Sequence, residues 1–469
     1  MNRAAFALLL AGCTPAVAPR GFGTSPVAEC DYVVHVESSR PVRLGVSATC
    51  RGRAVQGLES SDSRVASAIG SVTSDRGETV RDGDSFLLRT PAREVTFRYR
   101  IDLDALAEGH HRALARRSGE SLLAPTSSYL MYPWPLDVGI PVRVRFEAPP
   151  ELAVSSGLER EGDHYRLEAH EIPVATYSAF GKLARDVVPI DDAREELDVT
   201  VLDGELAVNE QRITRWAAER ARAVSAFYRG FPAARASLFV VPVPNRREVV
   251  FGNLLPESSP AAVLEVGSLT NDAALDDDWV LVHELFHIGV PSFHGEGKWF
   301  DEGLATYFEP IIRVRSGLLE PLNAWREFAL TMPRAERALT RDGLEQSDDI
   351  YWAGAIFCLL ADVTAREQSQ GRQGLEDGLR KVRAAGGNAS EVWPLKKTLE
   401  IADSAFAQPV LVPLWKRYAR KPAPLDLAAL FEALGVTRDG SGVHLSDAAP
   451  RAWVRRSIFE PGAAISASR

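Results

Sequence analysis

The chain has 469 residues, of which 45% are hydrophobic and 25% charged, and it carries a formal net charge of -9 at pH 7. This length exceeds what one ordinary hydrophobic core organises, so we expect two or three domains. The acidic balance, with no basic run in the sequence, argues against a nucleic-acid partner. No stretch approaches the ~20 consecutive apolar residues that a transmembrane helix needs.

The first residues are typical of a secretion signal. A short positive region from Met1 to Arg3 precedes an apolar run from Ala4 to Leu9. The run closes with Leu10-Ala11-Gly12-Cys13, which resembles the bacterial lipobox, where cleavage leaves an acylated cysteine at the new terminus. We therefore predict a lipoprotein signal peptide over residues 1–13 that ends at the lipidated Cys13. The alternative is a plain beginning of the first domain.

The same interpretation predicts the location of the protein. Residues 14–27, rich in Pro, Gly and Ala, would form a tether behind the lipid. The protein would be exported and anchored by its lipid to a bacterial membrane, with the folded part outside the cytoplasm. In that oxidising compartment Cys30 and Cys50, which flank two β-like runs, could pair as a disulfide. Cys358 lies in an apolar segment and is expected to be buried.

Residues 28–188 show the alternation of β-strands. Val95–Ile101 and Val142–Phe146 alternate apolar and polar side chains, and turn residues separate the runs. This pattern predicts antiparallel sheet structure with one buried face. Acidic and proline residues near position 190 mark a boundary, after which residues 189–469 combine short apolar strands with helical spacing. The second region is therefore predicted to be an α+β domain.

The segment from Trp279 to Glu309 carries the clearest chemical pattern. Three acids, Asp276 to Asp278, suit the start of a helix. One helical turn separates His283 from His287, so their side chains project from one face with Cβ atoms about 5–6 Å apart. Two imidazoles at that separation can bind one metal ion. Glu284, one residue further round the helix, is placed to reach water activated by the metal.

A second helical stretch, residues 299–309, offers the third ligand. Glu302 completes the His₂Glu set of a catalytic zinc site, which predicts one Zn²⁺ per chain with an open position for water. Thr306 and Glu309 follow Glu302 at i+4 and i+7, and are candidates to hydrogen-bond the outer nitrogens of the ligating histidines. The alternative is a pair of amphipathic core helices whose polar side chains are solvated.

The strings HELFH (283–287) and WFDEGLATYFE (299–309) resemble the gluzincin zinc metallopeptidases, specifically the aminopeptidase N and glycyl aminopeptidase families. Three features depart from the usual pattern. The gap between the second histidine and Glu302 is 14 residues rather than 18. Asp301 stands where these families often have Asn. The exopeptidase motif G-x-M-E-N is missing, and the nearest string, Ala262–Val266, keeps only Glu265.

The resemblance implies an α+β multidomain fold. An amino-terminal antiparallel β-sandwich over residues 28–188 would precede a thermolysin-like catalytic domain over 189–469 with a helical carboxy-terminal part. Residues 261–268 are the best candidate for an edge strand that holds an extended peptide. Glu265 in that strand would bind a substrate's amino group or simply point to solvent, and we favour solvent because one glutamate is not a motif.

A tyrosine completes the predicted site. Asp349 to Ala355 resembles the Y-x-x-G-A/F element that follows the zinc site in both families, where the tyrosine hydroxyl faces the metal. Tyr351 would then donate a hydrogen bond to the oxyanion of the reaction. The alternative is an aromatic cap on a core helix.

These residues predict a zinc-dependent metallopeptidase that hydrolyses peptide bonds of a peptide or protein substrate, with Glu284 as general base and acid. Exopeptidase and endopeptidase action stay open. One alternative is a zinc hydrolase that acts on a non-peptide electrophile. Another is a non-catalytic lipoprotein binding module that retains the fold.

Overall fold

The computed structural model describes residues 27–108, 113–256, 259–293, 295, 297–419 and 423–460. The predicted signal peptide, Cys13 and all of the tether but its last residue, Val27, lie outside these residues. The chain forms two compact units. The first comprises the chain up to Arg185, together with Thr200–Gly204 and a short stretch that ends at Ala261, and the second comprises the rest. The boundary predicted after residue 188 falls inside strand β15 (Leu183–Ile190).

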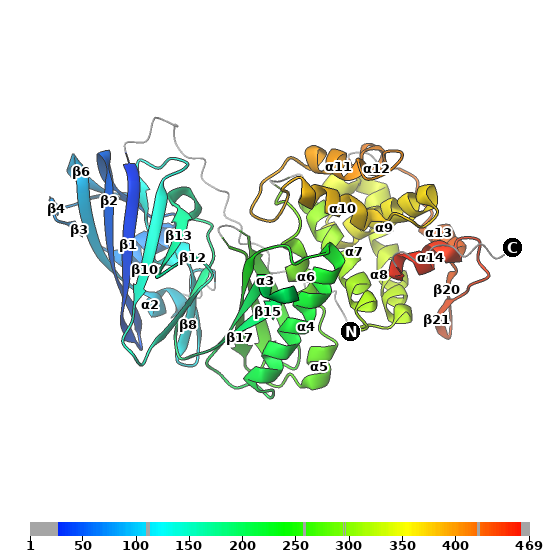
Figure 1. Ribbon diagram of the computed structural model, residues 1–469, viewed down its shortest axis with the longest axis horizontal. Coiled ribbons are helices and arrows are strands. Elements are labelled where there is room, and N and C mark those ends of the chain that lie inside the picture. Colours follow the sequence, from blue (N-terminus) through cyan, green and yellow to red (C-terminus); the bar gives the residue numbers. More distant parts are fainter. Residues whose placement is uncertain are drawn as a thin grey trace. The chain divides into compact units, whose positions relative to one another are not determined.

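The first unit is built on a ten-stranded sheet whose long strands lie side by side in Figure 1: β1 (Val27–Ser39), β2 (Val42–Glu59), β6 (Ser85–Asp102) and β10 (Pro141–Glu147). The shorter strands of this sheet are β3 (Thr73–Ser74), β4 (Gly77–Glu78), β5 (Val80–Asp82), β9 (Tyr132–Trp134), β12 (Glu159–Glu161) and β13 (His164–Glu168). Every pairing is antiparallel except that of β1 with β10, which is parallel. The prediction that all strands are antiparallel is wrong for this pair. Strands β1 and β10 are joined by a long connection that contains other strands rather than by a hairpin, and such a connection permits parallel pairing.

A second sheet has four strands in the order β11-β14-β8-β7. Their bounds are β7 (Arg116–Ser118), β8 (Ser121–Pro125), β11 (Ala153–Ser156) and β14 (Tyr177–Gly181), and two short helices, α1 (Ser63–Ile69) and α2 (Leu103–Glu108), complete the unit. Alternation explains the burial, since Val142 and Val144 of β10 are fully buried whereas Arg143 and Arg145, which alternate with them, are exposed. Leu122 and Phe180 from the second sheet belong to the same hydrophobic core. The amino-terminal unit is therefore β-rich, as predicted.

The two cysteines of this unit face each other across neighbouring strands. Cys30 of β1 is in register with Cys50 of β2, and their sulfur atoms are 2.00 Å apart in a disulfide. Both side chains are buried in the core, as is the free thiol of Cys358 in the second unit. The disulfide predicted as possible between Cys30 and Cys50 is thus present in the structure.

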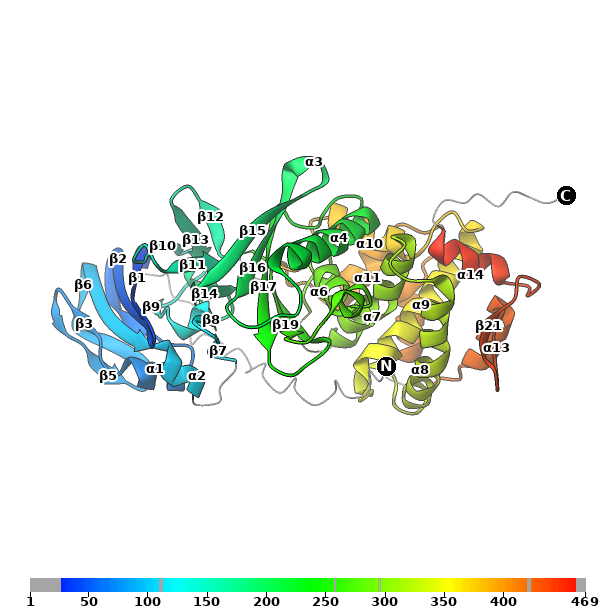
Figure 2. The ribbon, with the colours of Figure 1, turned by 90° about the horizontal axis from the view of Figure 1, so that it is seen from below.

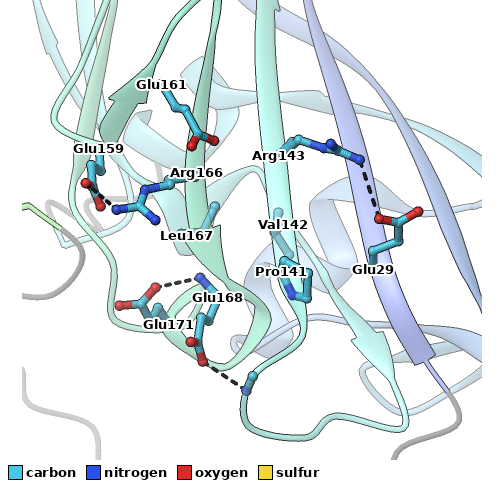
Figure 3. Close-up of a pocket in the computed structure, with 11 residues that line it drawn as sticks. Glu29, Pro141, Val142, Arg143, Glu159, Glu161, Arg166, Leu167, Glu168 and Glu171 are labelled. Carbon is cyan, nitrogen blue, oxygen red and sulfur yellow. Dashed lines mark hydrogen bonds and ion pairs between the residues drawn. The ribbon is translucent and has the colours of Figure 1, made fainter.

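The outer face of the large sheet carries paired charges. Arg51 donates to Asp31 at 2.7 Å and to Glu94 at 2.9 Å, and such exposed pairs contribute little to stability. Near the beginning of β10 lies a pocket of about 500 Å³, shown in Figure 3. Two of its glutamates pair with its arginines, since Glu159 lies 2.6 Å from Arg166 and Glu29 lies 3.5 Å from Arg143.

The second unit begins with a five-stranded sheet in the order β15-β16-β17-β19-β18. The bounds are β15 (Leu183–Ile190), β16 (Glu195–Leu202), β17 (Arg235–Val243), β18 (Val249–Leu255) and β19 (Ala261–Gly267). The edge next to β19 is therefore β18, and the prediction of residues 261–268 as the edge strand is wrong. All seven residues of β19 are buried, as expected for an interior strand, whereas β18 is mostly half-buried. Strand β18 also contains Gly252 and Asn253, whose low β-propensity makes its sequence resemble that of a loop.

Helices make up the rest of this unit (Figures 1 and 2), and no helix of the described residues is long and apolar enough to cross a membrane. Their bounds are α3 (Asp191–Arg194), α4 (Glu210–Tyr228), α5 (Asp272–Asp276), α6 (Val280–His287), α7 (Lys298–Arg315), α8 (Pro321–Asp342), α9 (Ile350–Ser369), α10 (Leu375–Ala384), α11 (Leu395–Asp403), α12 (Leu411–Tyr418), α13 (Leu427–Leu434) and α14 (Ala452–Phe459), with a hairpin of β20 (Val436–Asp439) and β21 (Gly442–Leu445). Helix α6 packs against β18, α4 and α7, and α7 packs along α9.

Candidate metal centre

Helix α6 starts at a buried carboxylate. Asp278 accepts hydrogen bonds from the backbone N–H groups of Val280 at 3.0 Å and Leu281 at 3.2 Å, so it is the member of the acidic triplet that caps the helix. Burial raises the pKa of Asp278 to about 6, against the effect of these hydrogen bonds and of two arginines. The cap fixes the start of a short helix that must present two histidines in a defined direction.

Helix α7 is brought to the site by its crossing with α9. Gly303 follows Glu302 directly, and a Cβ atom on it would collide with the backbone of Gly354 in α9. A Cβ atom on Gly354 would in turn collide with the carbonyl oxygen of Trp299. The two helices can therefore approach this closely only with glycine at both positions. The crossing sets Glu302 of α7 beside the first turn of α9, which carries Tyr351.

The three predicted ligands converge. Glu302 Oε2 lies 3.3 Å from Nε2 of His283 and 3.7 Å from Nε2 of His287. The ligand atoms of this trio are all within 4.8 Å of one another, and it is the metal-binding cluster found among the described residues. Two ligands about 2.0–2.1 Å from a tetrahedral zinc ion would be roughly 3.3–3.4 Å apart, close to the observed separations. The donor set and its spacing fit zinc.

The electrostatics of the trio also fit a cation. Burial raises the pKa of Glu302, but the hydrogen bond with His283 and the charges of both histidines outweigh it and lower this pKa to about 2. Burial lowers the pKa of His287, but Asp301 and then Glu302 outweigh it and raise it to about 10. The negative surroundings that hold a proton on His287 also attract a divalent cation, which would displace that proton on binding.

The outer nitrogens of the histidines are not held as predicted. Asp301 Oδ1 lies 2.8 Å from Nδ1 of His287, and His283 Nδ1 is buried without a hydrogen-bond partner among the described residues. The prediction that Thr306 and Glu309 hold these nitrogens is therefore wrong. Glu309 instead lies 3.0 Å from the buried guanidinium of Arg313 one turn along α7, and it shares that charge with Asp277 at 3.5 Å.

Glu284 is buried against the edge strand. A Cβ atom on Gly252 of β18 would lie 2.6 Å from Cγ and 2.7 Å from Oε1 of Glu284, so the carboxylate rests directly on the backbone of the edge strand. Burial raises the pKa of Glu284, and the two histidines oppose that rise. A carboxylate with a raised pKa accepts a proton more readily near neutral pH, as a general base must.

Tyr351 faces the trio from the first turn of α9. Its ring centroid lies 6.4 Å from that of His283, and Asp349 caps the helix by accepting from the N–H of Trp352 at 3.0 Å. Burial, followed by the charges of Glu302 and Glu284, raises the pKa of the Tyr351 hydroxyl, which therefore stays a hydrogen-bond donor. The position of the ring agrees with the predicted placement near the metal ligands.

Glu265 lies in the interior strand β19 and is only 7% exposed, so our preference for a solvent-facing side chain is wrong. Its proposed contact with a substrate's amino group stays a prediction. Two site residues were missed. Asp301 could have been found from its place one residue before Glu302, whereas Gly252 gave no signal, because its role depends on which strand forms the edge.

No protein-family model matches the chain, and no curated protein sequence matches it. Among solved structures the chain is similar to an aminopeptidase N family protein from Idiomarina loihiensis, with a TM-score of 0.69 and 15% sequence identity, over 87% of this chain and 78% of that chain. It is also similar to an M1 zinc metallopeptidase from Deinococcus radiodurans, with a TM-score of 0.51 and 13% identity, over 86% of this chain and 94% of that chain.

A mutant of an M1 zinc metallopeptidase from Deinococcus radiodurans, bound to a Tyr-Ser-Ala substrate, gives a TM-score of 0.53 and 13% identity over 86% of this chain and 95% of that chain. At such identities the likeness is one of fold. The chain thus has the fold of the aminopeptidase N family, with a β-rich amino-terminal unit and a helical carboxy-terminal part, as the resemblance of its zinc motif implied.

Proposed function

We propose that the protein is a zinc metallopeptidase. The single observation that carries this proposal is the convergence of Nε2 of His283, Nε2 of His287 and Oε2 of Glu302 beside a buried Glu284. When bound by these three atoms, zinc supplies Lewis-acid polarisation of a carbonyl group and activation of water. The aminopeptidase N fold supports a peptide as the substrate, and the Tyr-Ser-Ala complex of one structural neighbour adds to that support.

In this mechanism the chain's own residues move the proton and hold the charge. Glu284 takes a proton from the attacking water and passes it to the leaving amine, for which its raised pKa suits it. Tyr351, protonated throughout, donates a hydrogen bond to the oxygen that becomes negative as water adds to the carbonyl carbon. His283 and Glu284 are buried, and burial strengthens the electrostatic interactions of these side chains.

The test combines metal analysis with a peptide library. Zinc content near one ion per chain, with cleavage of library peptides that a chelator abolishes and zinc restores, is the expected result. Members with free and with acetylated amino termini distinguish exopeptidase from endopeptidase action. Glu284→Gln is the control, since it should keep zinc and lose turnover by about 10²–10⁴-fold. Zinc without any peptide cleavage would favour a hydrolase of non-peptide electrophiles, and a chain without zinc a binding module.

We also propose that the protein is exported and tethered to a bacterial membrane through lipidated Cys13. The Leu10–Cys13 string supports this proposal, and so does the disulfide between Cys30 and Cys50, because disulfides persist in oxidising compartments. Mass spectrometry of the mature protein should find an acylated Cys13 at its amino terminus. An exported protein that retains an unmodified Met1 would rule the anchor out.

A further inference from the structure

One carboxylate beside the ligand trio has no part in the proposed reaction. Asp301 lies in the first turn of α7, directly before Glu302, and its Oδ1 atom is 2.8 Å from Nδ1 of His287 in α6. The two side chains are 28% and 12% exposed, so the contact is partly shielded from water. We propose that Asp301 is a positioning residue that fixes the ring of His287 and thereby sets the affinity of the site for zinc.

The geometry gives the reason. A neutral imidazole carries one N–H and one lone pair, and an acceptor at Nδ1 places the N–H there and leaves the lone pair on Nε2. In this structure Nε2 of His287 is the nitrogen that faces Oε2 of Glu302, at 3.7 Å. Asp301 therefore selects the form of His287 that can bind a metal and holds its ring in the direction of the other ligands.

The two histidines differ in how they are held. Nδ1 of His283 has no hydrogen-bond partner among the described residues, and its ring is confined by aromatic neighbours, with Trp279 at 5.7 Å and Tyr351 at 6.4 Å between centroids. Packing restricts that ring but does not select a nitrogen for the proton. Of the two histidine ligands, only His287 thus has its outer nitrogen held by a hydrogen bond among the described residues, and Asp301 provides it.

Asp301 also joins the two helices of the site. Its backbone N–H donates to the carbonyl oxygen of Gly297 at 3.2 Å, so the residue is fixed at the start of α7. The neighbouring residue is the third ligand, and the partner of Asp301 is a ligand in α6. A hydrogen bond between Asp301 and His287 therefore sets the distance between the two ligand-bearing helices at the place where the ligands meet.

This inference rests on the proposed zinc site and is tested by zinc affinity rather than by turnover. The dissociation constant would be measured by competition with a chromophoric chelator for the wild type, Asp301→Ala, Asp301→Asn and Thr306→Ala. We expect zinc binding to weaken by about 10–100-fold in Asp301→Ala. Asp301→Asn, which keeps an acceptor oxygen, should recover most of the affinity. Thr306→Ala, a buried change on the same helix, should leave affinity unaltered.

Melting of the zinc-stripped variants provides the control for folding, since a positioning role leaves that temperature close to the wild-type value. Should Asp301→Ala fail to fold, Asp301→Ser serves in its place, because its shorter side chain cannot reach His287. Wild-type affinity in either variant would overturn the proposal, as would equal losses in Thr306→Ala. Wild-type protein that binds zinc but cleaves no peptide would instead count against the proposed function and leave the role of Asp301 intact.

Discussion

Two polar clusters involve helices α7 and α9 and their neighbours α6 and α10, and the two differ in charge balance. Towards the carboxy-terminal ends, Arg366 lies 3.0 Å from Asp362 and 2.8 Å from Glu376, which also accepts from Arg315 at 2.8 Å. Two guanidinium groups thus meet two carboxylates. Towards the amino-terminal ends lie the three carboxylates of Glu284, Asp301 and Glu302, and among the described residues only histidines are within ion-pair distance of the last two.

The difference teaches how to tell a structural cluster from a functional one. Both clusters perturb pKa values: burial raises the pKa of Glu376, but Arg366 and Arg315 outweigh it and lower that pKa to about 2, as the histidines do for Glu302. A shifted pKa alone therefore does not separate them. Charge balance separates the two clusters. In the first, arginines of the chain neutralise the carboxylates, whereas the second gathers negative charge that a bound cation would compensate.

The largest effect should come from removal of a ligand at the unbalanced cluster. Glu302→Ala deletes the carboxylate that lies within 3.7 Å of both histidine nitrogens. The variant should lose its zinc and with it all measurable peptidase activity, and prolonged chelation of the wild type should have the same effect. Metal analysis by mass spectrometry checks the loss. A Glu302→Ala protein that keeps one zinc per chain would show that the metal lies elsewhere.

The balanced cluster should respond through stability instead. Glu376→Gln leaves Arg366 buried with one fewer counter-charge, and loss of one partner in a buried pair typically costs about 3–5 kcal/mol of unfolding free energy. Chemical denaturation would measure that loss, while zinc affinity should stay unchanged. The matched control is Glu400→Gln in the exposed pair with Lys396 at 3.4 Å, for which we expect about 0.3–0.5 kcal/mol. A fall in zinc affinity in Glu376→Gln would erase the distinction between the clusters.

Tyr351→Phe tests whether the tyrosine belongs with the unbalanced cluster. The change removes only a hydroxyl, so the packing against His283 should survive. Loss of one oxyanion donor typically reduces turnover by about 10²–10³-fold. Because the donor acts mainly in the transition state, kcat should fall while KM hardly changes. Near-normal kcat with a lowered melting temperature would return Tyr351 to the alternative interpretation, an aromatic cap on a core helix.

The sequence predicted the local parts of this site and missed the parts that depend on tertiary contacts. Helical periodicity predicted His283 and His287, and the His₂Glu ligand pattern predicted Glu302 within a span of 20 residues; the structure brings the three together. The partners of the outer nitrogens were assigned by periodicity along α7, which favoured Thr306, whereas Asp301 reaches His287 across the gap between two helices. Periodicity within one helix carries no information about the direction of the next.

The sheet edge shows the same limit. The run Ala261–Gly267 is apolar enough to be recognised as a strand, but its neighbours in the sheet depend on the return path of the chain. The true edge, β18, has residues with low β-propensity at its centre, so its sequence favours a loop. What places β18 is its packing on α6, a contact between segments that no local pattern links.

A change in the packing of β18 on α6 should have the smallest effect of those predicted here. It should also separate zinc binding, which should persist, from turnover, which should fall. Gly252→Ala would place a methyl group 2.6 Å from Cγ of Glu284 and 2.7 Å from Cγ1 of Val280, too close for the carboxylate to keep its position. The three atoms nearest to such a methyl group belong to Glu284 and Val280 rather than to a metal ligand, so zinc content should stay at the wild-type level. Displacement of a general base by a fraction of an ångström to 1 Å should lower kcat by about 10–100-fold. Steady-state kinetics beside metal analysis would measure both quantities, with Gly440→Ala, in the exposed turn between β20 and β21 where a Cβ atom meets open space, as a backbone control for stability. Unchanged kcat in Gly252→Ala would mean that Glu284 tolerates movement away from the edge strand, and that the close contact serves packing alone.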